Sequence, residues 1–588
     1  MACARTHHFN NLSAPISIWR ACFYNWAFIA LLLTHRKRRP LSKSPMSFQS
    51  ETARRRTFAI ISHPDAGKTT LTEKLLLFSG AIHIAGSVKA RKATRHATSD
   101  WMEIEKQRGI SVASSVMQML YRDTVINLLE TPGHKDFSED TYRVLTAVDS
   151  ALMVIDAANG VEPQTRRLIE VCRQRNTPII TFINKLDREG RDPLELLDEV
   201  EQALGMPCVP MTWPVGQGKS FGGIIDLRKQ HMRLFKSGSD KHDEDKDELI
   251  PLTEQALLEK RFGNDYKLAC EAVELAAGAT EPFDPELFFA AKQTPVFFGS
   301  GVNNFGVQEV LDALVDLAPP PGERLSTNKD GSHTVVRPDS SAFSGVVFKV
   351  QANMDPSHRD RIAFVRVCSG KFEAGMKLRV QRTGKELRPT SVVTFMSQRR
   401  EAVSEAYAGD IIGFTTHGGV QLGDSITAGL PEQKDIQYTG LPFFAPELFQ
   451  TVELADPLKS KQLQAGLQQL GEEGAIQVFR PAAGGSMLLG AIGQLQFEVV
   501  QHRLLGEYGV KCRLGGSNFV GARWVSAATP EELRKFMDRN ALKLAYDGVN
   551  ALAYLLTSPY DLRLTQERHP EIEFHALREH AGLELQKS

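Results

Sequence analysis

The chain has 588 residues, of which 42% are hydrophobic and 24% are charged. This composition rules out a disordered chain, which would be poorer in apolar residues, and a multispanning membrane protein, which would be far richer. The 70 Lys and Arg residues balance the 70 Asp and Glu residues, so any contact with nucleic acid must come from a local basic patch. Seven cysteines without a CxxC pair argue against a disulfide framework and against a zinc site.

Residues 1–45 form an atypical N-terminal extension, because they contain no Asp or Glu and include the apolar stretch Ile16–Leu33. Three interpretations stay open. The stretch is long enough for a membrane anchor, although Arg20 within it would cost ~2.5–3.5 kcal/mol on insertion. Its acid-poor, arginine-containing composition is also typical of a targeting peptide. The third interpretation, which we favour, is a start codon assigned too early, with Met46 as the true first residue.

From residue 57 onward, short apolar runs alternate with amphipathic helical patterns. The runs lack the period-two alternation of a half-buried strand, which indicates a parallel sheet covered by helices on both faces. We therefore predict an α/β domain over residues 46–325, with an insertion near 211–283. The predicted buried strands are Thr57–Ile61, Val125–Leu129, Ala151–Ile155, Ile179–Ile183 and Pro295–Phe298.

The second half of the chain has a different pattern. Ala318–Gly322 (APPPG) is the clearest linker. Short β-rich runs with turn signals over residues 340–430 predict a small antiparallel β-barrel. Residues 446–588 mix helical and strand patterns and predict an α+β domain.

Four spaced motifs carry the chemistry, and the first one follows the first predicted strand. It matches the phosphate-binding loop GxxxxGK[ST] except that Ser62 replaces the first Gly, and a helical pattern follows it. In such a loop the backbone N–H groups point at phosphate oxygens, Lys68 reaches the β- and γ-phosphates, and the Thr69 hydroxyl ligates magnesium. The predicted phosphate-binding residues are Ser62, His63, Pro64, Asp65, Ala66, Gly67, Lys68, Thr69 and Thr70.

The second motif, Asn184-Lys185-Leu186-Asp187, directly follows a predicted buried strand. The Asp187 carboxylate can accept hydrogen bonds from both N1–H and the N2 amino group of guanine, a donor pair that adenine lacks. The motif therefore predicts selectivity for GTP over ATP. Ser300 and Gly301 follow the last predicted strand of the sheet; they are candidates for backbone contacts to the guanine oxygen, with a plain turn as the alternative.

The third motif, Glu130-Thr131-Pro132-Gly133-His134, also follows a buried strand. Glu130 is a candidate to hold a magnesium-bound water, the Gly133 N–H to meet the γ-phosphate, and His134 to act as the catalytic residue that positions the attacking water. The fourth motif, Lys106–Ser111, ends in a hydroxyl that can complete the magnesium shell when the γ-phosphate is present. The predicted metal ligands are Thr69, Ser111 and Glu130.

In this order, the four motifs resemble those of the translational GTPases typified by elongation factor G. Longer stretches, among them ANMDPSHRDRIAFVRVCSGKFEAGMKLR and GQLQFEVVQHRL, are similar to the bacterial peptide chain release factor 3 family over residues 54–580. The resemblance implies an α/β P-loop GTPase domain followed by a β-barrel domain and an α+β domain. It also implies a cytoplasmic monomer without a membrane partner. Such a protein binds GTP or GDP with Mg²⁺, is stimulated by the ribosome (rRNA and ribosomal proteins), and promotes dissociation of class I peptide chain release factors.

Two residues depart from the family pattern: Glu130 stands where the family has Asp, and Gly301 where it usually has Ala. Because of Glu130, a GTP-binding interaction protein with weak or no hydrolysis stays open as an alternative function. A related enzyme working off the ribosome is a third possibility, since similar P-loops occur in sulfate-activating enzymes, although the motif ANMDPSHRDR argues against it.

Because the net charge is zero, ribosome contact is expected to be local. The predicted barrel carries a set of basic side chains that forms either an rRNA-facing patch or a solvated face. These residues are Lys349, His358, Arg359, Arg361, Arg366 and Lys371.

Overall fold

The computed structural model describes residues 47–82, 105, 111–234, 248–328, 331–352, 361–389, 391–396, 399–416, 418–439 and 441–579. The chain divides into two units, Met1–Ser47 and Phe48–Ser588. The extension over residues 1–45 lies outside the described residues, so its three interpretations stay predictions. Among the described residues, no helix has both the length and the apolar character needed to cross a membrane.

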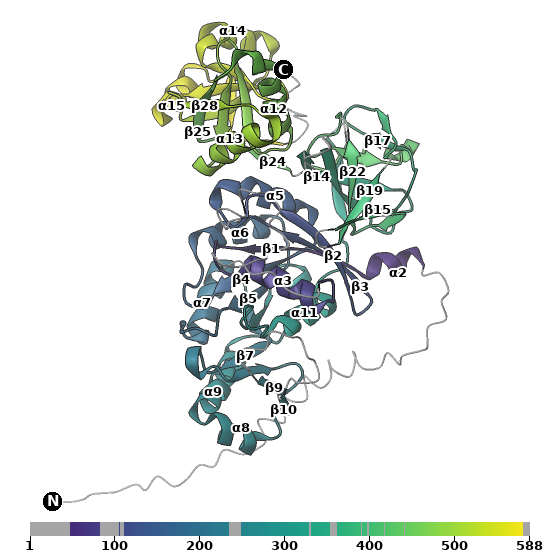
Figure 1. Cartoon of the computed structure of the whole chain (residues 1–588), viewed down its shortest axis with the longest axis vertical. Helices are drawn as coiled ribbons and strands as arrows, with labels where there is room; N and C mark the ends of the chain where they lie inside the picture. Colours follow the sequence, from purple (N-terminus) through teal and green to yellow (C-terminus); the bar gives the residue numbers. More distant parts are fainter. Residues whose placement is uncertain are drawn as a thin grey trace, which may run out of the picture. The chain divides into compact units, whose positions relative to one another are not determined.

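A seven-stranded sheet forms the core of the N-terminal region (Figure 1). All neighbouring strands pair in parallel, except that the second strand of the chain runs antiparallel to the third. The predicted sheet lacked this antiparallel edge strand and the short strand at the other edge. The strand order is β2 (Ser115–Tyr121), β3 (Thr124–Glu130), β1 (Arg55–Ser62), β4 (Ser150–Asp156), β5 (Ile179–Asn184), β11 (Thr294–Phe298) and β6 (Cys208–Pro210).

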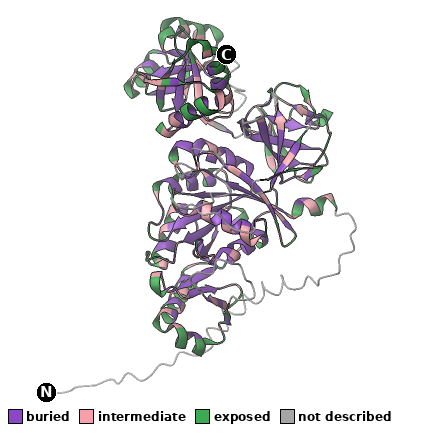
Figure 2. Cartoon of the chain, in the orientation of Figure 1, coloured by how far each residue is buried: buried purple, intermediate pink, exposed green. Residues whose placement is uncertain are grey.

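Helices cover both faces of this sheet, as predicted. Strand β1 shows why its apolar run lacks alternation: Phe58 and Ile60 pack into one hydrophobic cluster, whereas Ala59 and Ile61 pack into the other. Both faces are therefore buried, as Figure 2 shows for the strands of this sheet. The helices on one face are α5 (Ser138–Ala147), α6 (Pro163–Gln174) and α7 (Pro193–Leu204), and those on the other are α3 (Lys68–Phe78) and α11 (Val307–Asp316).

The region predicted as an insertion has its own small antiparallel sheet and helices. The sheet order is β10-β9-β8-β7. Its elements are β7 (Thr212–Val215), β8 (Gly223–Asp226), β9 (His231–Leu234), β10 (Leu249–Pro251), α8 (Gln255–Phe262) and α9 (Asn264–Ala279), followed by α10 (Pro285–Phe289).

The β-barrel region is built around an eight-stranded antiparallel sheet, with strand order β18-β17-β23-β14-β15-β22-β19-β20. There are two further strand pairs: β12-β13 precedes this sheet in the sequence, and β16-β21 is formed by strands that lie between those of the sheet in the sequence. The strands are β12 (Arg324–Thr327), β13 (His333–Val336), β14 (Ser344–Ala352), β15 (Arg361–Ser369), β16 (Lys371–Glu373), β17 (Leu378–Val380), β18 (Glu386–Leu387), β19 (Val392–Met396), β20 (Arg399–Ala402), β21 (Glu405–Tyr407), β22 (Ile411–Thr416) and β23 (Ser425–Thr427).

The C-terminal region is α+β, as predicted, with an eight-stranded sheet in the order β28-β25-β27-β26-β30-β31-β29-β32. Its elements are β24 (Pro442–Phe444), β25 (Leu448–Leu454), α12 (Ser460–Glu472), β26 (Gln477–Pro481), β27 (Leu488–Ala491), α13 (Gln494–Tyr508), β28 (Cys512–Gly516), β29 (Gly521–Ala527), α14 (Pro530–Asn540), β30 (Leu544–Tyr546), β31 (Leu552–Leu556), α15 (Pro559–Arg568), β32 (Ile572–His575) and β33 (Leu577–Glu579).

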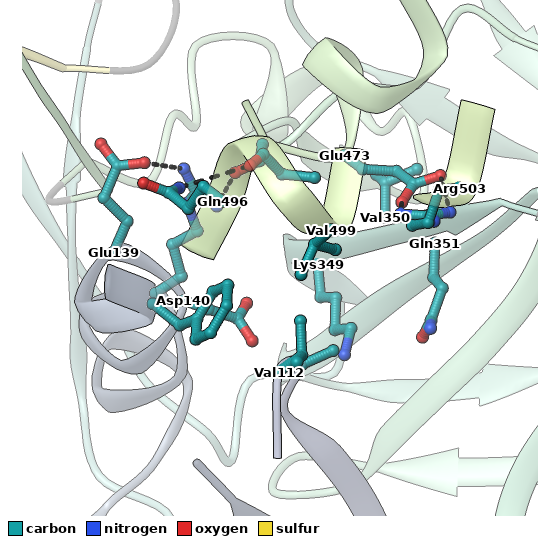
Figure 3. Close-up of a pocket in the computed structure, with 15 residues that line it drawn as sticks. Val112, Glu139, Asp140, Lys349, Val350, Gln351, Glu473, Gln496, Val499 and Arg503 are labelled. Carbon is teal, nitrogen blue, oxygen red and sulfur yellow. Dashed lines mark hydrogen bonds and ion pairs between the residues drawn. The ribbon is translucent and has the colours of Figure 1, made fainter. Parts of the chain in front are cut away.

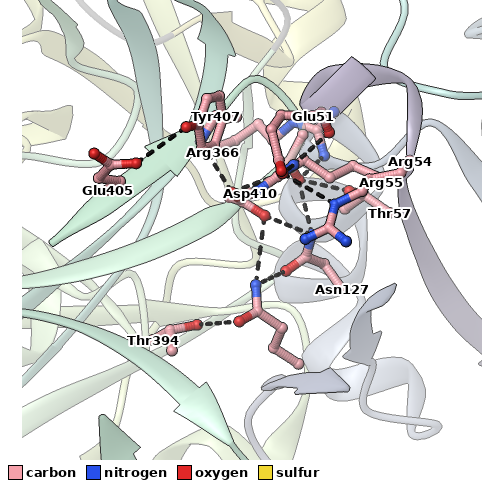
Figure 4. Close-up of polar contacts among 12 residues, drawn as sticks. Glu51, Arg54, Arg55, Thr57, Asn127, Arg366, Thr394, Glu405, Tyr407 and Asp410 are labelled. Atoms are coloured by element: carbon pink, nitrogen blue, oxygen red, sulfur yellow. Dashed lines mark hydrogen bonds and ion pairs between the residues drawn. The ribbon is translucent and has the colours of Figure 1, made fainter. Parts of the chain in front are cut away.

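A buried polar contact joins the barrel to the seven-stranded sheet (Figure 4). Arg55 in β1 donates to Asp410 at 2.8 Å, and the two side chains are only 7% and 6% exposed. The neighbouring Gly409 carbonyl accepts from Thr57 Oγ1 at 2.6 Å and from Asn127 Nδ2 at 3.1 Å. The turn before β22 is thus held by donors from two strands of the other domain.

The structure contradicts the predicted basic patch at two of its positions. Lys349 and Arg366 are buried, because both side chains reach across to the N-terminal region. Lys349 donates to Ser114 Oγ at 3.1 Å, and Arg366 pairs with Asp149 at 2.5 Å. Burial lowers the pKa of the Lys349 ammonium. Of the others, Arg361 pairs with Glu472, Lys371 pairs with Glu373 and Glu405, and His358 and Arg359 lie outside the described residues.

We expect Asp410→Ala to lower the free energy of unfolding by ~2–3 kcal/mol, measured by urea denaturation. Removing one partner of a buried ion pair costs ~3–5 kcal/mol, and Glu51, which also pairs with Arg55 at 2.8 Å, reduces that penalty. As a control, Glu567→Ala removes the partner of the exposed Arg563 and is expected to cost less than ~1 kcal/mol. Equal effects of the two substitutions would contradict the stabilising role of Asp410.

Candidate active site

The carboxyl ends of four strands bring the predicted site residues to one edge of the sheet. Strands β3 and β4 flank β1, and β5 lies between β4 and β11, all in parallel. The loops that follow β1, β3, β5 and β11 therefore leave the sheet at the same edge, which is where ligands bind in open α/β folds. These loops carry three of the four motifs and the Ser300-Gly301 pair.

The loop after β1 turns sharply before α3 begins at Lys68. Asp65 and Gly67 both have left-handed backbone conformations, with φ of 64° and 101°. A Cβ at position 67 would also lie 2.3 Å from Asn184 Nδ2. Both the backbone conformation and the lack of space therefore favour glycine at this position. Because Gly67 is the N-cap and offers no side-chain oxygen, the first N–H groups of α3 face a location favourable to an anionic phosphate.

Asn184 ties three loops together through its side-chain amide. Its Nδ2 donates to the Ala66 carbonyl at 2.9 Å, and its Oδ1 accepts from the Gly301 N–H at 2.8 Å. The same oxygen accepts from the Lys185 N–H at 2.9 Å. Within the motif after β5, Asn184 is therefore the residue that holds the phosphate loop against the loop after β11.

The rest of that motif is fixed by partners that sequence reasoning missed. Lys185 has a left-handed backbone (φ 72°) and pairs with Asp156 at the end of β4 at 2.6 Å. The Asp187 carboxylate accepts from Ser300 Oγ at 2.6 Å, and Asn303 donates to the same hydroxyl at 3.1 Å. Asp156 carries the same signal as the predicted residues, a polar side chain ending a buried strand, whereas nothing in the sequence marks Asn303.

The loop after β3 lies directly against the phosphate loop. A Cβ at Gly133 would meet Lys68 Nζ at 2.8 Å and the Pro64 Cα at 3.2 Å, so a side chain there would displace the lysine or crowd the phosphate loop. Thr131 is fully buried and donates from Oγ1 to the Ile60 carbonyl at 2.7 Å. The Thr131 side chain therefore holds the loop to β1, and Gly133 is the residue that faces the lysine.

Thr69 and Glu130 meet at the start of α3. The Thr69 hydroxyl donates to Glu130 Oε1 at 2.6 Å, and Glu130 is buried. Ser111, the third predicted metal ligand, lies in the segment that leads into β2, next to Val112 and Ala113, which both donate backbone N–H groups to Glu105. Residues 106–110 of the fourth motif lie outside the described residues, so the role of Ser111 stays a prediction.

His134 follows Gly133 and caps the short helix η1 (Lys135–Phe137). Its Nδ1 lies 3.1 Å from Asp136 Oδ1 and 3.3 Å from the Asp136 backbone nitrogen; Nδ1 donates to the carboxylate when it carries a proton and accepts from the N–H when it does not. The imidazole is one-third exposed, whereas the Asp136 side chain is 5% exposed. The structure therefore gives the predicted catalytic histidine an acidic partner on one ring nitrogen. In the phosphate loop, His63 instead lies 3.3 Å from Glu162.

Comparison with known proteins identifies three family models along the chain. Residues 53–320 match the elongation factor Tu GTP binding domain, residues 342–429 match elongation factor G domain 2, and residues 438–566 match the class II release factor RF3 C-terminal domain. Together the three models cover the GTPase, barrel and α+β regions.

Curated relatives match over most of this chain. Peptide chain release factor 3 of Bordetella pertussis is 66% identical over 538 residues, which is 91% of this chain and 99% of the relative. The protein of the same name from Nitrosomonas europaea is 63% identical over 541 residues, covering 92% and 99%. Among solved structures, a Thermus thermophilus protein designated ttk003000868 aligns with a TM-score of 0.63 and 25% identity, covering 81% of this chain and 69% of its own.

We expect Asp187→Asn to weaken GTP binding ~10–150-fold, measured by titration calorimetry. The substitution replaces an anionic acceptor that faces two guanine donors, and charge-assisted hydrogen bonds contribute ~1.5–3 kcal/mol. Ser300→Ala removes only the hydroxyl that orients the carboxylate and is expected to cost less than Asp187→Asn. The control Asp198→Asn, on the exposed face of α7, is expected to bind GTP like the wild type. An unchanged preference for GTP over ATP in Asp187→Asn would contradict the assignment.

Proposed function

Because this chain belongs to the peptide chain release factor 3 family of translation-termination GTPases, we propose that it hydrolyses GTP when stimulated by the ribosome. We propose further that it acts in the cytoplasm as a monomer and promotes dissociation of class I peptide chain release factors. The observation that supports GTP hydrolysis is the contact between the loop after β3 and the phosphate loop. In this contact Gly133 lies against Lys68, and His134 is the next residue in the chain.

In the proposed reaction, the loop after β1 and the N-terminus of α3 bind the phosphates, and Lys68 neutralises charge on the β- and γ-phosphates. Asp187, oriented by Ser300, reads the guanine. Water attacks the γ-phosphorus and the bond to the β–γ bridging oxygen breaks, giving GDP and inorganic phosphate. We assign to His134 the orientation of that water: Nδ1 is next to Asp136, which leaves Nε2 as the ring nitrogen for the contact with the water.

The residues at the start of α3 fit magnesium. The donor set is a hydroxyl, Thr69 Oγ1, and a carboxylate, Glu130, both hard oxygen ligands of the kind that Mg²⁺ prefers. No group of three or more His, Cys, Asp and Glu side chains within the described part of the chain is arranged to hold a metal, so phosphate oxygens and water would complete the shell. When bound, magnesium neutralises charge that develops on the phosphates.

A GTP-binding interaction protein without hydrolysis is the disfavoured alternative. The phosphate-loop lysine and His134 are both present, and Glu130 reaches the magnesium-binding threonine rather than being displaced from it. The longer side chain at position 130 therefore supports an altered magnesium requirement instead of a lost activity.

His134→Ala is expected to lower ribosome-stimulated kcat by ~10²-fold or more, because positioned groups of this kind contribute 10²–10⁴-fold. GTP affinity should be unchanged, since the phosphate loop supplies the ground-state contacts. Rates measured with saturating 70S ribosomes test this, with His333→Ala on the exposed strand β13 as the control. Wild-type turnover in His134→Ala would make this histidine a structural residue.

Glu130→Asp is expected to shift the midpoint of a magnesium titration of GDP binding downward, by as much as ~10-fold. In the wild type the Glu130 carboxylate accepts a hydrogen bond from the Thr69 hydroxyl at 2.6 Å, and this hydrogen bond must rearrange before the hydroxyl oxygen can ligate magnesium. The shorter Asp withdraws from Thr69, whereas Glu130→Gln keeps the length but removes the charge and should shift the midpoint upward. Identical midpoints in all three proteins would show that Glu130 takes no part in magnesium binding.

A further inference from the structure

Asp136 bridges the candidate catalytic histidine and the C-terminal domain. One carboxylate oxygen, Oδ1, lies 3.1 Å from His134 Nδ1. The other, Oδ2, accepts at 2.8 Å from the backbone N–H of Leu495, the second residue of α13. Both oxygens of one buried carboxylate are thus engaged, one by the residue two positions earlier and one by a helix 359 residues further along the chain.

Gly493, the N-cap of α13, makes this approach possible. A Cβ at this position would lie 1.9 Å from Asp136 Cγ and 2.3 Å from each carboxylate oxygen. Its φ of −142° is ordinary extended backbone, so the local conformation does not require glycine. The absence of a side chain at position 493 serves the approach of Asp136.

Further apolar and polar contacts near Asp136 join the N-terminal region to the C-terminal domain. Val112, Phe137 and Val499 form a small buried cluster, with Leu495 packed against it. Further along, Arg143 in α5 donates to the Gly474 carbonyl at 3.2 Å. Residues from these elements line a cavity of about 70 Å³. Figure 3 shows Val112 on one side of this pocket and Val499 and Gln496 of α13 on the other. The segment before β2, η1 and α5 therefore all contact the C-terminal domain.

We propose that Asp136 is a positioning residue for His134. We propose further that the contact of α13 with Asp136 determines where the His134 imidazole lies. A histidine that orients a reactant needs its other ring nitrogen fixed by a partner. Here the partner carboxylate cannot rotate while α13 holds Oδ2, so the C-terminal domain determines whether the imidazole is aligned for hydrolysis. This inference rests on the proposed GTPase function of His134.

The test is a double-mutant cycle between positions 493 and 134, with kcat and the KM for 70S ribosomes measured separately. Gly493→Ala displaces the Asp136 carboxylate without changing its chemistry, and we expect kcat to fall ~10–100-fold, as misplacement of a catalytic group by about 1 Å does. GTP affinity and the KM for ribosomes should stay at the wild-type values. In a His134→Ala background, Gly493→Ala should cause no further loss, because the two positions act through one group.

Gly506→Ala is the matched control, since it lies on the same helix with nothing within 4 Å of its Cβ; it should keep the wild-type kcat.

If Gly493→Ala does not give the wild-type melting curve, Asp136→Asn replaces it. That variant keeps the shape of the side chain and is expected to lower kcat with the same non-additivity. The inference is overturned if Gly493→Ala and Asp136→Asn keep the wild-type kcat, if losses at positions 493 and 134 multiply, or if only the KM for ribosomes rises. A wild-type chain that does not hydrolyse GTP with ribosomes would overturn the proposed function itself.

Discussion

One amide side chain determines the geometry of the nucleotide-facing edge. Asn184 donates to the loop after β1 and accepts from the loop after β11, at 2.9 and 2.8 Å. The first of these loops contains the left-handed residues Asp65 and Gly67, and a left-handed non-glycine residue such as Asp65 is strained. The Asn184 amide contributes to the stability of this loop by donating a hydrogen bond from a distant strand to the Ala66 carbonyl.

Several basic side chains are buried where the domains of this molecule meet. Arg55, Lys349 and Arg366 are all buried, and each reaches a partner in another domain. Such contacts require that both partners stay together, since a buried charge without its partner is strongly destabilising. These contacts therefore favour one arrangement of the domains. They also mean that Arg55, Lys349 and Arg366, which a charge count treats as available to RNA, already have partners within the protein.

The sequence was sufficient to predict the fold class, because the buried strands of a parallel sheet are apolar on both faces and so stand out as short runs. It was insufficient for β2, where Leu120 is 55% exposed and only part of the strand is buried. The candidate phosphate loop and base-reading motif were recognisable because their residues are adjacent in the chain; their binding roles stay predictions. Asn303, Asp136 and Gly493 were not, since their roles depend on contacts that only the folded chain creates, and the same limit explains the wrong prediction for Lys349 and Arg366.

Asn184 and Asp187, the first and last residues of the motif after β5, make different contacts. Asn184 supports the architecture of the loops, whereas Asp187 lies on a separate support formed by Ser300 and Asn303. The hydroxyl that orients Asp187 is that of Ser300, whereas the amide that bonds the phosphate loop is that of Asn184. If Asp187 reads the base as we propose, substitutions at positions 187, 300 and 303 are expected to alter the purine preference with less effect on phosphate binding. A change at position 184, by contrast, would have to be matched at position 67, whose missing side chain makes room for the amide.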